Sequence, residues 1–115
     1  RDQEQQRARL EGMSHRLAAL MGVARPFDTD EIVTADSALA PGYGRVGEGT
    51  LAAIRMMAQT EGIFLDPVYS GKTFAGVLDL CRAGRIAEGD KVVMLHTGGQ
   101  AALFAYQAEL ATRNG

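Results

Sequence analysis

The sequence predicts an α/β fold with parallel strands, and two observations support this prediction. After Gly49 the apolar pattern alternates as helix, strand, helix, strand and helix, the order expected of a parallel sheet covered by helices. In addition, two short apolar runs, 63–66 and 91–96, each end in a glycine-containing loop that opens an apolar-periodic helix. The expected architecture is therefore a partial three-layer α/β arrangement.

The composition limits the kinds of partner and the compartment that can be expected for this protein. Of the 115 residues, 46% are hydrophobic and 23% are charged, as in ordinary globular proteins. The net charge of −2 gives no reason to expect a nucleic acid or an anionic membrane as partner, and no apolar run approaches the roughly 20 residues of a membrane span. The single Cys81 cannot form an internal disulfide, which suits a reducing compartment, so we expect a cytoplasmic protein.

Residues 1–46 are predicted to hold one helix followed by connecting loops. Apolar side chains recur at spacings of three and four, which predicts a helix over residues 2–21 that ends at Gly22. The expected inward stripe is Leu10, Met13, Leu17 and Leu20. Residues 32–34 form a candidate short strand before a loop. The chain begins at Arg1 without an initiator Met or a signal-peptide pattern, which indicates a segment of a longer protein.

Residues 47–107 are predicted to form the alternating helix and strand part. A helix over 49–60 precedes the first strand, a second helix that ends at Gly84 separates the strands, and a third begins near Gly99. The expected inward side chains are Leu51, Ile54 and Met57 in the first helix and Phe74, Val77, Leu78 and Cys81 in the second. Residues 108–115 are expected to form a frayed tail, so the chain is treated as one segment, 1–115.

Polar side chains directly follow the predicted strand ends, where open parallel sheets bind ligands. Tyr69 can orient a substrate or transfer a proton, and Ser70 can hydrogen-bond a ring nitrogen or a phosphate. Alternatively, Ser70 and Gly71 turn the chain and cap the next helix. Tyr43 lies between two glycines, so it either covers a pocket or belongs to a surface loop.

The second loop, Thr97–Gly99, offers backbone N–H groups at a helix start, which is a ready anion site. Glycines after a strand are also needed for tight turns, so this signal is weak by itself. His96 can be an acid, a base, a metal ligand or a structural residue. The only other histidine, His15, lies in the first helix, so a metal site has little support.

Three segments form ordered motifs: Pro41–Gly49, Thr60–Lys72 and His96–Tyr106. They contain, in one-letter code, PGYG, DPVYSGK and HTGG. In this order they resemble the D-cysteine desulfhydrase and 1-aminocyclopropane-1-carboxylate deaminase family, over most of the chain. The resemblance implies the C-terminal part of a longer pyridoxal-phosphate enzyme with a tryptophan-synthase-like fold. It also implies a homodimer that acts on a small amino acid.

The resemblance implies roles for individual residues. Tyr43 and Tyr69 match the two tyrosines that line the substrate side of the cofactor, and Tyr69 is the stronger candidate for proton transfer. Ser70 matches the position that faces the pyridine nitrogen. Thr97 and Gly98 match positions beside the cofactor.

The identity of Ser70 favours one reaction within the family. The deaminases carry a glutamate there, which keeps the ring nitrogen protonated and makes the cofactor a strong electron sink. A neutral hydroxyl makes a weaker sink, which is sufficient for β-elimination but less suited to opening a cyclopropane. Thr97, where the deaminases tend to have leucine, points the same way. The expected activity is therefore conversion of D-cysteine to pyruvate, sulfide and ammonia.

Several alternatives stay open. An L-cysteate sulfo-lyase would fit if Arg45, beside Tyr43, meets the sulfonate rather than solvent; 1-aminocyclopropane-1-carboxylate deaminase is another. From a different class, the chain can be a non-catalytic α/β module that holds phosphate on Gly98. Lys72 and Lys91 are the only lysines, and neither matches the family's Schiff-base position, so the chain alone is predicted to be inactive.

Overall fold

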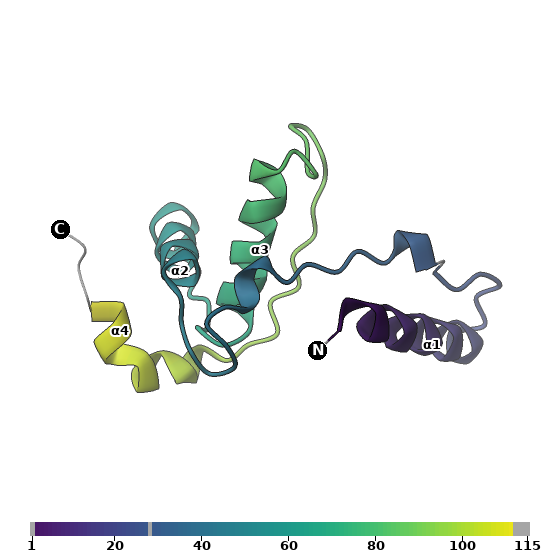
Figure 1. The fold of residues 1–115 in the computed structure, drawn as a ribbon, viewed down its shortest axis with the longest axis horizontal. Helices are drawn as coiled ribbons and strands as arrows, with labels where there is room; N and C mark the ends of the chain where they lie inside the picture. The colour runs from purple at the N-terminus through teal and green to yellow at the C-terminus, as the bar shows by residue number, and fades with distance from the viewer. Residues whose placement is uncertain (1, 28, 112–115) are drawn as a thin grey trace. The chain divides into compact units, whose positions relative to one another are not determined.

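The computed structural model describes residues 2–27 and 29–111. The chain divides into two compact units, residues 1–36 and 37–115 (Figure 1). Among the described helices, none combines the length and the apolar character needed to cross a lipid bilayer.

The first unit contains helix α1, Gln3–Met21, as the apolar spacing predicted, and a 3-10 turn η1, Thr29–Glu31. The helix begins at Asp2, whose carboxylate accepts the Glu4 N–H at 3.1 Å. It ends at Gly22, which takes the left-handed conformation with φ 65°. Both ends are therefore set by local hydrogen bonding.

The predicted inward stripe of α1 is not buried. Leu10, Met13, Leu17 and Leu20 keep between 42% and 85% of their surface exposed. Ser14 is instead the buried residue of the helix, and its hydroxyl lies 3.4 Å from the Phe27 carbonyl oxygen. An apolar helix face becomes buried only when another element packs on it, and in this unit the short turn η1 covers little.

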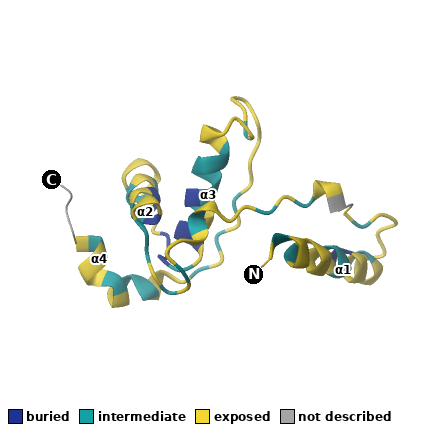
Figure 2. Cartoon of the chain, viewed as in Figure 1, coloured by how far each residue is buried: buried dark blue, intermediate teal, exposed yellow. Residues whose placement is uncertain are grey.

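The second unit is built around two helices, α2 (Glu48–Glu61) and α3 (Ser70–Arg82), which pack side by side (Figure 1). Its other elements are the 3-10 helices η2 (Ser37–Leu39) and η3 (Gln100–Tyr106) and the short helix α4 (Gln107–Ala111). The apolar core of the described residues is small and consists of Ala53, Ile54, Leu65 and Ala75. Figure 2 shows buried residues on both α2 and α3.

The predicted inward faces of these helices are only partly confirmed. Ile54 is buried, whereas Leu51, Met57 and the larger apolar side chains of α3 from Phe74 to Leu78 are half-buried. Cys81 is exposed, so its prediction as a core residue was wrong. The fully buried residues of α3 all lie in its first half, and the last turn extends beyond the packed region.

The predicted parallel strands are absent from the described residues. Residues 63–66 and 91–97 are irregular connections without a strand ladder, and residues 32–34 are likewise irregular. A side chain joins the first two segments instead, because His96 Nε2 lies 3.1 Å from the Phe64 carbonyl oxygen. Parallel strands need ladder partners and cover on both faces, and here Val93 and Leu95 stay 92% and 78% exposed.

The predicted third helix also differs. Residues after Gly99 form the 3-10 helix η3 before α4 begins, so the regular α-helix starts later than expected. The predicted tail, 108–115, is helical as far as Ala111, and residues 112–115 lie outside the described residues.

Gly71 allows α2 and α3 to approach closely, and its replacement tests this packing. A Cβ atom there would lie 2.7 Å from the Asp66 carbonyl oxygen and 2.8 Å from Ile54 Cγ1. We therefore expect Gly71→Ala to lower the free energy of unfolding by about 1–3 kcal/mol, through overpacking. Chemical denaturation followed by circular dichroism measures the change.

Gly76 offers the matched control, because it lies in the same helix and a Cβ atom added there would meet nothing within 4 Å. Gly76→Ala should stabilise the helix by roughly 0.5–1 kcal/mol. Equal effects of the two substitutions would contradict the close-approach explanation.

Candidate functional site

The candidate site is organised by the buried carboxylate of Asp66, which is 1% exposed. Its Oδ2 accepts the backbone N–H groups of Val68 at 2.9 Å and Tyr69 at 2.8 Å. Its Oδ1 accepts the backbone N–H of Ser70 at 2.7 Å and the Ser70 hydroxyl at 2.5 Å. The carboxylate thus folds residues 66–70 into the turn that starts α3, and satisfies backbone donors at the helix end.

These hydrogen bonds also decide the ionisation of Asp66. Burial alone would raise the pKa of this carboxyl group, because desolvation disfavours the charged form. The hydrogen bonds from the Ser70 hydroxyl and from the three N–H groups outweigh burial and lower the pKa below its ordinary value of 3.8. Asp66 is therefore a carboxylate at neutral pH.

Ser70 is buried directly beneath this carboxylate. Its hydroxyl donates to Asp66 Oδ1 and accepts the Asp66 backbone N–H at 2.8 Å, and the residue is 3% exposed. These are the contacts of a residue that helps to cap a helix, the alternative that the sequence left open. The role of Ser70 opposite a ring nitrogen stays a prediction.

Two tyrosines that are 26 residues apart in sequence meet at the same helix start. The hydroxyl oxygens of Tyr43 and Tyr69 lie 2.7 Å apart, and the rings are edge-to-face with centroids 6.3 Å apart. Both side chains are exposed, Tyr43 by 84% and Tyr69 by 58%. The hydrogen bond with Tyr43 raises the pKa of Tyr69 above 10.0, and the nearby charge of Asp66 adds to the rise. Tyr69 therefore holds its proton at neutral pH.

The loop that carries Tyr43 is attached on both sides. The ammonium group of Lys72 donates to the carbonyl oxygens of Gly42 at 2.7 Å and Leu39 at 3.3 Å. The Tyr106 hydroxyl donates to the Gly44 carbonyl oxygen at 2.6 Å. Backbone atoms on either side of Tyr43 are therefore fixed by side chains from α3 and η3.

The second predicted loop lies next to the first. A Cβ on Gly99 would lie 2.9 Å from Asp66 Cγ, so only glycine permits this approach, and its φ of 93° also requires glycine. The Gly98 N–H donates to His96 Nδ1 at 3.1 Å, which leaves the Nε2 proton of the neutral ring to face the Phe64 carbonyl. His96 thus has structural contacts. The Gly98 N–H is already used, which weakens the interpretation of this loop as an anion site.

The side chains of two predicted site residues make no hydrogen bond or ion pair among the residues that the structure describes. Thr97 is exposed at the loop surface, and the Arg45 side chain is exposed beside the tyrosine loop. Across residues 2–27 and 29–111, no three His, Cys, Asp or Glu side chains gather in a way that would hold a metal ion.

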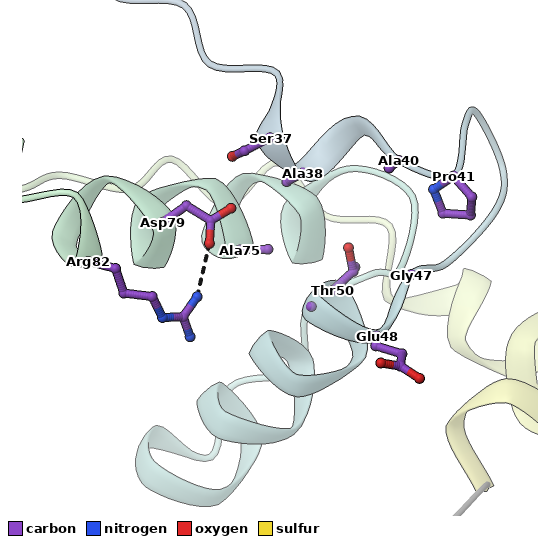
Figure 3. Close-up of a pocket in the computed structure, with 11 residues that line it drawn as sticks. Ser37, Ala38, Ala40, Pro41, Gly47, Glu48, Thr50, Ala75, Asp79 and Arg82 are labelled. Carbon is purple, nitrogen blue, oxygen red and sulfur yellow. Dashed lines mark hydrogen bonds and ion pairs between the residues drawn. The ribbon is translucent and has the colours of Figure 1, made fainter.

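A cavity of about 390 Å³ lies between η2, the start of α2, and α3 (Figure 3). Small residues such as Ala38, Ala75 and Gly49 line it, and Arg82 and Asp79 form an ion pair at 2.9 Å along one wall. Neither tyrosine of the pair lines this cavity, so it is separate from the candidate site.

Sequence reasoning missed three residues that shape the site: Asp66, Lys72 and Tyr106. The spacing of Asp66 before Pro67 and Ser70 is a recognisable turn and capping pattern, which was a usable signal. Nothing local indicated the partners of Lys72, because its carbonyl acceptors lie 30 and 33 residues earlier.

Residues 2–98 match the family described as pyridoxal-phosphate dependent enzymes. The match spans most of the chain, and the chain therefore belongs to this family.

Two groups of relatives have similar sequence identity to the chain. The chain is 38% identical over 110 residues to a D-cysteine desulfhydrase of Yersinia pestis (strain Pestoides F), covering 96% of the chain and 33% of that protein. It is 39% identical over 103 residues to a 1-aminocyclopropane-1-carboxylate deaminase of Pseudomonas syringae pv. syringae (strain B728a), covering 90% of the chain and 30% of that protein. The chain thus spans about a third of the length of these curated relatives.

A solved structure supports the same relationship. A crystal structure described as that of an ACC deaminase homologue matches with a TM-score of 0.64 and 35% identity. The match covers 90% of this chain and 30% of that one. The fold of this chain therefore corresponds to part of that protein's fold, although the described residues contain no strand.

Replacing Asp66 tests its role as the organiser of the site. Because folding lowers the pKa of Asp66 below 3.8, its stabilising contribution is complete above that value and is lost as the pH falls through the folded-state pKa. In Asp66→Asn this part of the pH dependence should disappear. The lost hydrogen bonds should also lower the free energy of unfolding at neutral pH by about 2 kcal/mol or more.

Urea unfolding at several pH values measures both effects. Asp90→Asn is the matched control, since Asp90 is exposed and accepts only the Ala87 N–H, at 2.8 Å. If Asp66→Asn kept the full acid dependence of the wild-type chain, the assignment to Asp66 would be wrong.

Replacing Tyr43 tests the hydrogen bond between the two tyrosines. Tyr43→Phe removes the partner hydroxyl, so we expect the pKa of Tyr69 to fall toward 10.0. The chain has three tyrosines and no tryptophan, so tyrosinate absorbance reports the titration with little overlap. Phe27→Leu is the control, because it replaces an exposed aromatic ring in the first unit and leaves both tyrosines of the pair in place. An unchanged Tyr69 pKa in Tyr43→Phe would contradict the contact.

Proposed function

We propose that this chain forms part of a pyridoxal-phosphate-dependent β-eliminating lyase of the D-cysteine desulfhydrase type, with a tryptophan-synthase-like fold. Membership of the pyridoxal-phosphate-dependent family supports the cofactor and the enzyme class. The observation that carries the proposal is the pair of Tyr43 and Tyr69 hydroxyls, 2.7 Å apart, next to Ser70 at the start of α3.

The residues present fit the substrate side of such a cofactor better than its phosphate side. Two exposed phenol groups at one point suit a small, polar amino acid, and Ser70 offers a neutral hydroxyl beneath them. For a phosphate, by contrast, the Gly98 N–H is engaged by His96, so one of the backbone donors of this loop is already used. The remaining phosphate donors and the Schiff-base lysine would have to come from outside this chain, which we propose is inactive alone.

The tyrosine pair would bind and orient the substrate. When one hydroxyl donates to the other, the accepting hydroxyl keeps its own proton available for a substrate oxygen. Because the pKa of Tyr69 is raised above 10.0, Tyr69 keeps its proton at neutral pH and would hydrogen-bond the substrate rather than act as a base. Pyridoxal phosphate, when bound, supplies the electron sink for the charge that develops at the substrate's α-carbon.

Ser70 supports β-elimination over cyclopropane opening. To donate to a ring nitrogen, the Ser70 hydroxyl would turn its hydrogen away from Asp66. Asp66 would keep the hydrogen bonds from its three backbone N–H donors. Ser70 itself adds no charge at the nitrogen, and a weak electron sink suffices when a good leaving group departs from the β-carbon. Because desulfhydrase and deaminase relatives are similarly identical to this chain, this residue rather than overall identity favours the desulfhydrase activity.

Further proposals concern the setting of the enzyme. We propose a cytoplasmic homodimer that acts on a small amino acid, without nucleic-acid or membrane partners, in keeping with the net charge of −2 and the lone exposed cysteine. Size-exclusion chromatography with light scattering measures the assembly.

A substrate panel tests the proposed reaction on the full-length enzyme that contains this chain. D-Cysteine, L-cysteine, L-cysteate and 1-aminocyclopropane-1-carboxylate are offered separately, and sulfide, sulfite, pyruvate and 2-oxobutyrate are measured. We expect sulfide and pyruvate from D-cysteine. 2-Oxobutyrate from the cyclopropane substrate as the main product would overturn the inference from Ser70.

Sulfite from L-cysteate would retain β-elimination but change the substrate. In that case Arg45→Met should raise the KM for L-cysteate, because Arg45 would be the cation that meets the sulfonate. Arg85→Met, at another exposed arginine away from the tyrosines, is the matched control and should leave KM unchanged.

A further inference from the structure

Lys72 is a buried cation with unusual partners. It is 9% exposed in the first turn of α3, and among the described residues no carboxylate pairs with it. Its ammonium group contacts two backbone carbonyl oxygens instead, those of Gly42 at 2.7 Å and Leu39 at 3.3 Å. Burying an ammonium group costs free energy unless it is hydrogen-bonded, so these two carbonyls explain why the charge is tolerated there.

The Gly42 carbonyl belongs to the loop that carries Tyr43, and the Leu39 carbonyl belongs to the last residue of η2, where this loop begins. On the other side of Tyr43, the Tyr106 hydroxyl donates to the Gly44 carbonyl oxygen at 2.6 Å. Gly42 and Gly44 have positive φ angles of 136° and 68°. Because glycine can adopt many backbone conformations, a loop with two glycines has many alternatives when nothing holds it. Three hydrogen bonds to backbone oxygens therefore select one conformation of this loop.

Tyr43 itself contributes little to its own placement. Its ring is 84% exposed and lies outside the apolar core, so packing cannot hold it against Tyr69. The other partner, Tyr69, stands three residues before Lys72 at the start of α3. One short stretch of α3 thus supplies one tyrosine of the pair and the cation that fixes the loop of the other.

We propose that Lys72 is a positioning residue, which acts with Tyr106 to hold loop 39–44 so that the Tyr43 hydroxyl meets that of Tyr69. The significance of this contact for catalysis rests on the proposed function, in which the tyrosine pair receives the substrate. The positioning itself is a property of the chain and does not depend on the reaction.

Nuclear magnetic resonance of the full chain with labelled tyrosine rings tests the positioning directly. The three tyrosines are assigned from their phenylalanine variants, and the ring-to-ring Overhauser contact between Tyr43 and Tyr69 is measured at neutral pH. We expect the contact in the wild type, its loss in Lys72→Met, and its recovery in Lys72→Arg, which keeps the charge and the donors. Lys91→Met, at the other lysine, which is exposed, should leave it unchanged.

Circular dichroism on the same samples separates positioning from stability. A Lys72→Met chain that keeps its helical signal but loses the ring contact supports the proposal. Persistence of the ring contact in Lys72→Met would overturn it. So would loss of the helical signal in both Lys72→Met and Lys72→Arg, because Lys72 would then support the fold rather than the loop.

Kinetics of the full-length enzyme on its best substrate form the second arm. Lys72→Met should lower kcat/KM by about tenfold to a hundredfold, as expected for misplacement of a substrate-contacting group by about 1 Å, while Lys72→Arg recovers most of it. If the ring contact responds as expected but the enzyme turns over no member of the substrate panel, the proposed function fails and the positioning role stands. An active Lys72→Met enzyme with unchanged kcat/KM would show that the contact does not serve catalysis.

Discussion

The buried carboxylate of Asp66 is the interaction on which the rest of the second unit depends. It collects four hydrogen bonds within five residues, and so turns an extended segment into the first turn of α3. The same turn places Tyr69 at the surface and Ser70 beneath it. Gly99 approaches the carboxylate from the second loop and Gly71 approaches the Asp66 carbonyl from α3, and both need glycine for that reason.

The candidate site combines a buried pair of polar residues with exposed hydroxyl groups. Asp66 and Ser70 satisfy each other inside the unit, whereas Tyr43 and Tyr69 present their hydroxyls to solvent. Exposed side chains lack packing to hold them, so their placement depends on the backbone beneath. In this chain the backbone around Tyr43 is held by Lys72 and Tyr106, which donate to carbonyl oxygens.

Elements governed by local forces were predicted well from the sequence. The bounds of α1 and α2 follow from apolar spacing, and Gly22 and Gly62 end these helices in the left-handed conformation. Features that need a distant partner were predicted poorly. The runs 63–66 and 91–96 have the composition of strands, yet a strand exists only when another strand accepts its hydrogen bonds. Cys81 and the leucines of α1 match a buried pattern, but within its own unit each of them is exposed among the described residues.

The sequence by itself determined α1, α2 and α3 and the glycines that end α1 and α2, because hydrogen bonds and steric limits within a few residues decide these features. It also singled out the candidate tyrosines, through their places in the loops and motifs. Only the tertiary structure decided that Tyr43 meets Tyr69, that Lys72 binds carbonyls about 30 residues earlier, and that Ser70 is tied to Asp66. Contacts between distant residues require the intervening loops to close, at an entropic cost that only the assembled packing offsets. No local pattern in the chain specifies which distant groups will meet.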